Sequence, residues 1–187
     1  KESSRSIKLI SWNIMDHKKS KFLIASHIPE PEHKYISRYF NVSKILYLTH
    51  LMYLKDIDII CLEECSIEAL DIISKILSTN YHIYYHEINQ LLTAFLKVKY
   101  EENNIVEYKE NRKHKFEINT HNSQFVIINV HVAGNDSSFI QSLQIQQNDN
   151  NNAIIIVGDF NQEYRVLRHM KPLTTFKQDP HINTSYH

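Results

Sequence analysis

Four short apolar runs, rich in isoleucine and valine, constrain the fold of this chain more than any other feature. Each run has the length of a strand rather than of a helix, and polar or turn residues flank it. Because the runs are almost continuously apolar, we expect strands buried on both faces, as in a sheet that lies between other layers. The runs cover residues 7–14, 57–62, 125–132 and 153–157.

Helices and weaker strands are predicted between these runs. Residues 41–54 and 66–77 carry apolar side chains at spacings of three and four, which is typical of amphipathic helices. Ser66 stands where it can cap the second helix. Alternating apolar and polar residues predict three more strands, which could pair as an antiparallel meander, at residues 81–86, 92–98 and 115–119.

Three polar stretches are expected outside these elements. Residues 26–35 contain two prolines and residues 101–114 carry mixed charges, so both are interpreted as loops or insertions. Residues 144–152 form a polar tract that can cap a helix or stay flexible but cannot pack a core. Many strands with few helices predict an α/β fold in which two sheets pack together.

Size and charge limit the classes of protein that this chain can belong to. With 187 residues, 42% of them hydrophobic, we expect one domain covering residues 1–187. Lys plus Arg and Asp plus Glu both number 21, so no overall field draws the chain to nucleic acid or to a membrane. No apolar run approaches the roughly 18 residues of a membrane span, so no membrane association is expected.

The cysteines and glycines argue against a zinc knuckle, a P-loop and a dinucleotide-binding motif. Cys61 and Cys65 lie in and just after an apolar run, which favours reduced thiols and an intracellular location, cytoplasmic or nuclear. Their spacing does not fit a two-residue zinc knuckle. The two glycines, Gly134 and Gly158, do not form the loop that a P-loop or a dinucleotide-binding motif needs.

Polar residues stand in or just after the ends of the four apolar runs. Because strand ends can share one rim of a sheet, we expect carboxylate, carboxamide and imidazole groups to meet there. Taken singly, each has an ordinary interpretation as a strand end, a solvated helix entry, a core histidine or a turn. Four strands that all end this way favour a shared site. Its residues are Asn13, Glu63, Glu64, Asn129, His131, Asp159 and Asn161.

These motifs, in this order, resemble those of the endonuclease/exonuclease/phosphatase superfamily, which includes DNase I, apurinic endonucleases, inositol phosphatases and nocturnin-type deadenylases. The match of residues 158–161, Gly-Asp-Phe-Asn, is the strongest. Residues 59–64 resemble a strand ending in Leu-Gln-Glu, with Glu63 replacing glutamine, which adds a charge, and Glu64 matching the metal-binding glutamate. Residues 129–132, Asn-Val-His-Val, resemble the family's Asn-Thr-His-Leu.

The resemblance implies a four-layer α/β/β/α sandwich of the DNase I-like type and a hard divalent cation. Mg²⁺, with Mn²⁺ as an alternative, prefers oxygen ligands and keeps several waters. Glu64 is expected to hold it, helped by Asn13 and Asp159. The cation would offset the charge that builds on a substrate phosphate.

Catalytic roles also follow from the resemblance. Asp159 would orient or deprotonate the attacking water, and Asn161 would position that side chain and the phosphate. His131 would donate a hydrogen bond to a phosphate oxygen. Asn129 is grouped with these catalytic residues. None of them needs to form a covalent intermediate.

The family's last motif, Ser-Asp-His, is not found. Residues 185–187 read Ser-Tyr-His and follow Asn161 too closely for the usual last strands. We therefore expect residues 173–187 to precede the missing motif in a chain truncated at its C-terminus, and a degenerate, inactive relative would have the same pattern. His187 is the weaker candidate for the missing histidine.

The predicted function is Mg²⁺-dependent phosphodiester hydrolysis with RNA as the expected partner. Residues 29–54 and 91–97 resemble the corresponding stretches of nocturnin and related deadenylases, which favours a 3′ exonuclease or deadenylase-like nuclease over DNA repair. Tyr164 could stack on a base, and four basic residues could follow a phosphate backbone, although a solvated helix explains them equally well. They are Arg165, Arg168, Lys171 and Lys177.

Two alternative functions stay open. One is a phosphatase or lipid-headgroup phosphodiesterase with the same fold. The other is a catalytically inactive binding module that kept the fold but lost the terminal Asp/His pair. The sequence predicts neither the oligomeric state nor the polarity of degradation.

Overall fold

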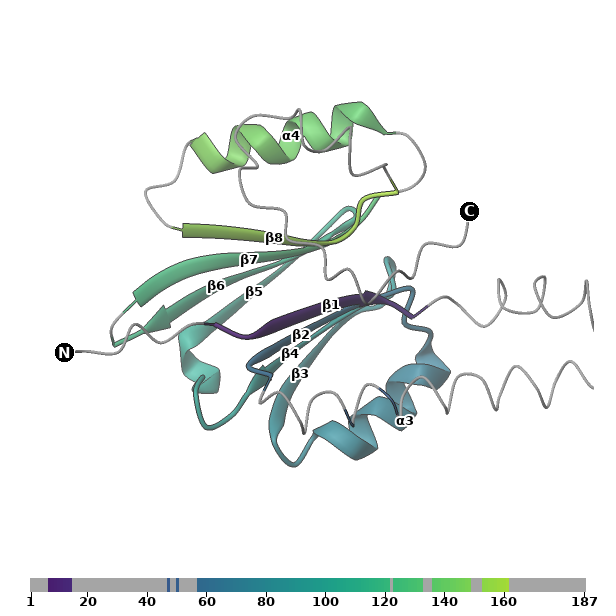
Figure 1. Cartoon of the computed structure of the whole chain (residues 1–187), viewed down its shortest axis with the longest axis vertical. Coiled ribbons are helices and arrows are strands. Elements are labelled where there is room, and N and C mark those ends of the chain that lie inside the picture. Colours follow the sequence, from purple (N-terminus) through teal and green to yellow (C-terminus); the bar gives the residue numbers. More distant parts are fainter. Residues whose placement is uncertain are drawn as a thin grey trace, which may run out of the picture.

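Two four-stranded mixed sheets lie face to face, and a helix covers the outer face of each (Figure 1). The computed structural model describes residues 7–14, 47, 50, 57–121, 123–132, 136–148 and 153–161. The first sheet has the order β1 (Leu9–Asn13), β2 (Ile59–Glu63), β4 (Leu91–Leu96) and β3 (Tyr81–His86). The second has the order β5 (Ile105–Glu110), β6 (Lys113–Thr120), β7 (Ser123–His131) and β8 (Ala153–Asp159).

The helices α3 (Ile67–Leu77) and α4 (Ser137–Asn148) complete four layers, so the predicted α/β/β/α sandwich is confirmed. The predicted cap of the first helix is also present, because the Ser66 hydroxyl accepts a hydrogen bond from the Ala69 amide at 3.2 Å. The predicted helix at 41–54 lies outside the described residues, except that Tyr47 and His50 are helical. The loop predicted at 26–35 also lies outside them.

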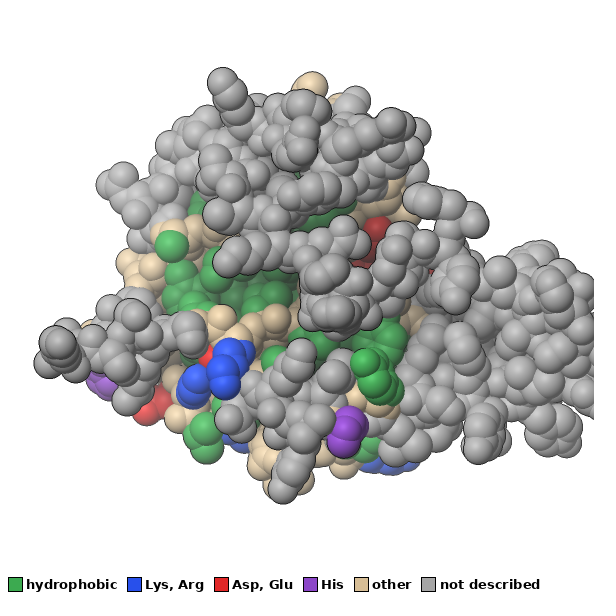
Figure 2. Space-filling model, in the orientation of Figure 1, with side chains coloured by type: hydrophobic (Ala, Val, Ile, Leu, Met, Phe, Trp, Pro, Cys, Tyr) green, Lys and Arg blue, Asp and Glu red, His purple; other side chains and the backbone are tan. Residues whose placement is uncertain are grey.

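The four apolar runs form β1, β2, β7 and β8, but they differ in burial. β2 is buried along its whole length, as are residues 125–130 of β7. β1 and β8 are sheet edges and only partly buried, so the expectation of burial on both faces is wrong for them. Figure 2 shows hydrophobic side chains gathered on the face between these two edge strands.

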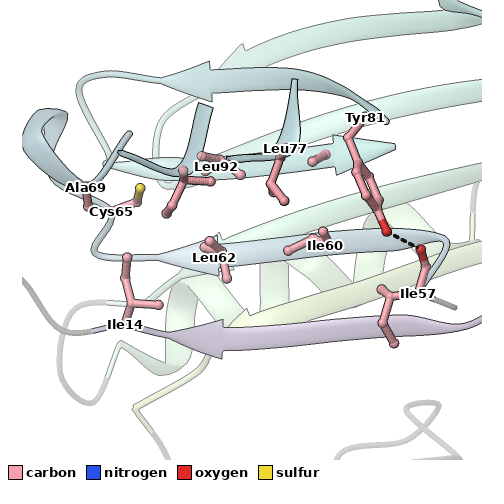
Figure 3. Packing of buried hydrophobic residues seen from close by; sticks show 11 residues of the cluster. Ile14, Ile57, Ile60, Leu62, Cys65, Ala69, Leu77, Tyr81 and Leu92 are labelled. Atoms are coloured by element: carbon pink, nitrogen blue, oxygen red, sulfur yellow. Dashed lines mark hydrogen bonds between the residues drawn. The ribbon is translucent and has the colours of Figure 1, made fainter. Parts of the chain in front are cut away.

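Three layers of apolar packing hold the sandwich together. Between α3 and the first sheet, Ile60, Leu62 and Leu92 pack against the helix (Figure 3). Between the sheets, Phe95 and Phe116 meet edge to face with ring centroids 5.0 Å apart and are fully buried. A third cluster joins the outer face of β7 and β8 to α4. Burial of such side chains stabilises a fold by about 1.5–3 kcal/mol each.

Two elements correct the predictions for the polar stretches. The predicted loop at 101–114 contains a short 3-10 helix (Glu102–Asn104), all of β5 and the start of β6. β5 is an edge strand whose charged side chains alternate with Val106 and Tyr108, so its charge does not prevent pairing. The tract at 144–152 is helical as far as Asn148, the last residue of α4.

The predicted meander is also wrong, because β6 lies in the other sheet from β3 and β4.

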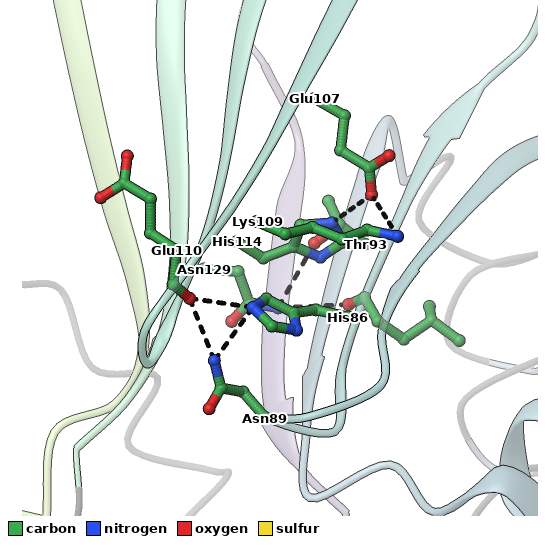
Figure 4. A network of polar contacts seen from close by, with 9 residues as sticks. His86, Asn89, Thr93, Glu107, Lys109, Glu110, His114 and Asn129 are labelled. Atoms are coloured by element: carbon green, nitrogen blue, oxygen red, sulfur yellow. Dashed lines mark hydrogen bonds and ion pairs between the residues drawn. The ribbon is translucent and has the colours of Figure 1, made fainter.

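A polar network lies between the sheets, near the ends of β3 and β5 (Figure 4). The buried His86 donates from Nε2 to the Glu110 carbonyl oxygen at 2.8 Å, and the buried His114 lies 2.6 Å from Glu107 Oε1 through its own Nε2. The two imidazole rings meet edge to face, 5.7 Å between centroids. The network ties the β3–β4 turn of one sheet to the β5–β6 hairpin of the other.

His114 is expected to make the protein less stable in mild acid. Burial lowers the pKa of His114 from 6.5 to about 4, against the hydrogen bond to Glu107. As the pH falls, His114 therefore binds a proton near pH 6.5 in the unfolded chain but only near pH 4 in the folded protein. Stability contributed by the neutral ring is fully present above pH 6.5 and is lost as the pH falls toward 4, by on the order of 3 kcal/mol.

Urea unfolding at about pH 7.5 and about pH 4.5 measures this effect. The wild-type protein should lose more stability between the two pH values than the His114→Gln variant, whose amide can keep the contact with Glu107. An equal loss in the two proteins would contradict the assignment.

Among the described residues, no helix is both long enough and apolar enough to cross a bilayer. Cys61 and Cys65 are both free and buried. Burial raises the pKa of the Cys65 thiol to about 12. The thiols therefore remain protonated and pack as small apolar groups.

Candidate metal centre

Four strands end together at one edge of the sandwich. β1 and β2 are parallel and pair Asn13 with Glu63 at their ends. β7 and β8 are also parallel and pair His131 with Asp159. Parallel pairing puts the carboxyl ends of neighbouring strands at the same rim, so the polar residues that follow the apolar runs come together.

Three potential metal ligands converge at this rim. One ligand atom each from Glu64, His131 and Asp159 lies within 4.8 Å of the others. His131 Nε2 is 3.3 Å from Glu64 Oε1. The Asn13 amide joins them, because its Nδ2 donates to Asp159 Oδ2 at 2.6 Å and to Glu64 Oε1 at 3.2 Å. The site thus draws on both sheets.

The electrostatics of this cluster favour a cation. Two unit negative charges no more than 4.8 Å apart repel each other by at least about 3.5 kcal/mol at an effective dielectric constant of about 20. Glu64 is only 6% exposed, so water screens it poorly. Two carboxylates and an imidazole nitrogen are a donor set that fits Mg²⁺ or Mn²⁺. Acidic atoms, in red, are visible in Figure 2 at the end of the molecule where β1 and β8 end.

Unusual backbone conformations are concentrated at the same rim. Among the described residues, four non-glycine residues have positive φ, and each follows a strand end or lies in a turn at this edge. They are Glu64 at 52°, Gln90 at 52°, Arg112 at 60° and Asn161 at 46°. Such conformations cost about 1–2 kcal/mol in L-residues and persist where surrounding contacts enforce them.

The turn after β8 is held by hydrogen bonds to the end of β7. The backbone amide of Asn161 donates to Asp159 Oδ1 at 2.9 Å. The Asn161 side-chain amide donates to the Val132 carbonyl oxygen. The Val132 amide in turn donates to the Asp159 carbonyl oxygen at 2.8 Å. The backbone amide of Asn161 therefore contacts the Asp159 carboxylate. The predicted role of Asn161 in positioning that side chain and the phosphate stays a prediction.

Glu63 is not part of the convergent group and is almost fully buried. Burial raises the pKa of Glu63 well above its usual range, and the charges of Asp159 and Glu64 raise it further. The Ser11 hydroxyl donates to Glu63 Oε1 at 2.9 Å and opposes this shift. Burial therefore opposes the added charge that the sequence predicts for Glu63, and that expectation stays a prediction.

Asn129 lies inside the sandwich and is fully buried. Its amide group donates to the carbonyl oxygens of Leu92 at 3.2 Å and Leu62 at 3.4 Å, so it links β7 to β4 and β2. These contacts support the strands that carry the candidate metal ligands. The predicted catalytic role of Asn129 stays a prediction. The predicted role of Asn13 as a metal ligand also stays a prediction, and its amide nitrogen, which donates hydrogen bonds, faces the Glu64 and Asp159 carboxylates.

The residues that hold His131 in place were not found from the sequence. The His131 amide donates to the Arg112 carbonyl oxygen at 3.3 Å. The Arg112 guanidinium binds Asp136 at 2.6 Å, and Asp136 caps α4 by accepting from the Phe139 amide. Hydrogen bonds from Ser138, the Phe139 amide and Arg112 lower the pKa of Asp136 to about 2. The Asp-Ser-Ser sequence from Asp136 is a helix-capping signal that could have located this helix start.

The predicted nucleic-acid contacts after Asn161 cannot be compared with the structure. Tyr164, the basic residues and His187 all lie outside the described residues. The basic residues in question are Arg165, Arg168, Lys171 and Lys177.

Comparison with known proteins identifies the fold. No protein-family model matches the sequence, and the search of curated proteins found no relative. Solved structures do match. TDP2 from D. rerio, complexed with a single-strand DNA product, is 14% identical with a TM-score of 0.56, and the match covers 84% of this chain and 61% of that one.

Two structures from Bacteroides thetaiotaomicron give the same result. An endonuclease/exonuclease/phosphatase family protein is 13% identical with a TM-score of 0.55, over 84% of this chain and 64% of that one. A mannosyl-6-phosphatase is 13% identical with a TM-score of 0.54, over 83% and 66%.

The chain therefore has the DNase I-like fold of endonucleases, exonucleases and phosphatases. Its matched part corresponds to less than two thirds of each of these three structures. At these identities the likeness shows the fold alone. The predicted resemblance to nocturnin-type deadenylases stays a prediction.

Proposed function

We propose that this protein is a Mg²⁺-dependent hydrolase of phosphate esters, most simply a phosphodiesterase that acts on RNA. The observation that carries the proposal is the convergence of Glu64, His131 and Asp159 within 4.8 Å at one rim of the sandwich. They come from the ends of β2, β7 and β8, on both sheets. Fixed donors from separate rigid strands can hold a cation and a phosphate in one orientation.

Glu64 and Asp159 would hold the metal ion, and His131 lies within reach as a further ligand or donor. When bound, Mg²⁺ would offset the negative charge that develops on the phosphate oxygens. The oxygen-rich donor set fits this hard cation. Asn13 would restrain both carboxylates, because its amide already bridges them.

Asp159 and His131 would share the proton chemistry and the phosphate contact. The Asp159 carboxylate is fixed by Asn13 on one oxygen and by the Asn161 amide on the other. A fixed carboxylate can orient a water molecule and accept its proton. His131 is partly exposed and can donate from its ring to a phosphate oxygen.

RNA is the substrate that the sequence favours, because residues 29–54 and 91–97 resemble the corresponding stretches of nocturnin-type deadenylases. Basic residues and Tyr164 also follow the Asp159 motif. A single basic stretch can follow a phosphate backbone even when the net charge is zero. TDP2 binds a DNA product and another protein with this fold is a mannosyl-6-phosphatase. A phosphatase that acts on small phosphate esters is therefore the second candidate function.

A substrate panel tests these proposals on the full-length protein. The substrates are labelled poly(A) RNA, single-stranded DNA of the same length and a hexose 6-phosphate, each with Mg²⁺, with Mn²⁺ or with EDTA. We expect metal-dependent shortening of the RNA and its loss in EDTA. Phosphate release from the sugar without RNA cleavage would support the phosphatase. Metal-dependent binding of RNA without turnover of any substrate would support a binding module.

A further inference from the structure

Glu64 must be held in its backbone conformation by its neighbours. Its φ of 52° lies in the left-handed region, which glutamate rarely adopts. This conformation occurs between the end of β2 and Ser66, which caps α3. It redirects the Glu64 carboxylate toward Asn13 and His131, with which it makes contact.

Two hydrogen bonds hold the residue that follows. The Cys65 amide donates to the Gln90 carbonyl oxygen at 2.8 Å. The Tyr85 hydroxyl donates to the Cys65 carbonyl oxygen at 2.7 Å. Tyr85 belongs to β3, and Gln90 belongs to the turn that follows it, so both bonds come from the hairpin formed by β3 and β4. Cys65 itself is fully buried.

We propose that Tyr85 is a positioning residue for the metal carboxylate of Glu64. Its hydroxyl fixes the peptide group between Cys65 and Ser66, while the Gln90 carbonyl oxygen holds the Cys65 amide on the side of Glu64. With both sides of Cys65 held, rotation of the backbone at Glu64 is limited. The inference rests on the proposed function, because it takes Glu64 as a metal ligand. Residues that orient a ligand without touching the metal commonly contribute 10- to 100-fold to metal affinity.

The chain contains a matched control in the same strand. Tyr81 lies four residues earlier in β3, and its hydroxyl donates to the Ile57 carbonyl oxygen at 2.8 Å (Figure 3). Both tyrosines therefore donate to a backbone carbonyl that flanks β2. Ile57 precedes β2 and is remote from the metal ligands, whereas Cys65 follows it directly after Glu64.

The experiment compares Tyr85→Phe with Tyr81→Phe, each of which removes one oxygen atom and keeps the ring. Mn²⁺ affinity is measured by calorimetric titration, and the melting temperature is measured in EDTA. We expect similar decreases in melting temperature for the two variants. Tyr85→Phe should raise the Kd for Mn²⁺ by about tenfold, while Tyr81→Phe should leave it unchanged.

The possible outcomes separate this inference from the proposed function. Equal Mn²⁺ affinity in wild type and Tyr85→Phe would overturn the positioning role and leave the metal centre intact. Equal weakening by both variants would also overturn it, because general loosening of β3 would then explain the effect. A wild-type protein that binds no Mn²⁺ would overturn the proposed metal centre and the inference together.

Discussion

Replacing Asp159 by alanine is expected to lower metal-dependent hydrolysis by about 10³-fold, the scale of losing a general base or a fixed charge at the reacting phosphate. The carboxylate belongs to the convergent group at the rim and accepts hydrogen bonds from Asn13 and Asn161. Its removal would therefore eliminate a candidate metal ligand and the group that would orient the water. The measurement is kcat/KM at saturating Mg²⁺ for the substrate found in the panel.

A matched control for this variant is Asp71→Ala. Asp71 lies on the exposed face of α3, where it pairs with Lys75 at 2.6 Å. Its removal should change activity less than twofold, since surface ion pairs contribute little. If Asp159→Ala kept more than about a tenth of wild-type activity, a difference of only about 1.4 kcal/mol in barrier height, the assigned mechanism would be wrong.

Gly158→Ala is expected to give the largest loss of stability, about 3 kcal/mol or more. Gly158 has a φ of 134°, which side chains rarely permit, and lies in β8 directly opposite Val130. A Cβ at this position would be 2.0 Å from the Val130 carbonyl oxygen and 2.8 Å from its carbonyl carbon and amide nitrogen. Because these are backbone atoms of a buried strand, they cannot move aside without breaking the pairing of β7 and β8.

Chemical denaturation of Gly158→Ala measures this loss, with Val157→Ala as the control in the same strand. Val157 is partly buried between the sheets, so truncation should cost less than the glycine substitution. The displaced strand would also move Asp159, and activity should fall with stability. A Gly158→Ala protein within about 1 kcal/mol of wild type would mean that the close approach to Val130 is absent.

Much of the sandwich could be predicted because its central strands are encoded locally. β2 and β7 are runs of isoleucine, leucine and valine with no helical periodicity. The polar groups at the strand ends identified the rim, and the structure brings Glu64, His131 and Asp159 within 4.8 Å there. A polar motif at the end of a buried strand predicts where its side chains lie as well as their type, because the sheet places the ends of its strands at a common rim.

The remaining features depend on contacts between distant segments. β5 is a strand because it pairs with β6 at the sheet edge, although half of its six residues are charged. The raised pKa of Glu63 follows from its burial, which no local pattern reveals. The same is true of Tyr85, whose hydroxyl contacts Cys65 across 20 positions of sequence.

The spread of the candidate metal centre along the chain has a consequence for folding. Asn13 is separated from Glu64 by 51 positions and from Asp159 by 146, yet its amide bonds to both. Bringing such remote segments together costs conformational entropy before the contacts between them stabilise the fold. We therefore expect these hydrogen bonds to form late in folding. Catalytic competence should therefore be the last property to return during refolding, after fluorescence and circular dichroism have recovered.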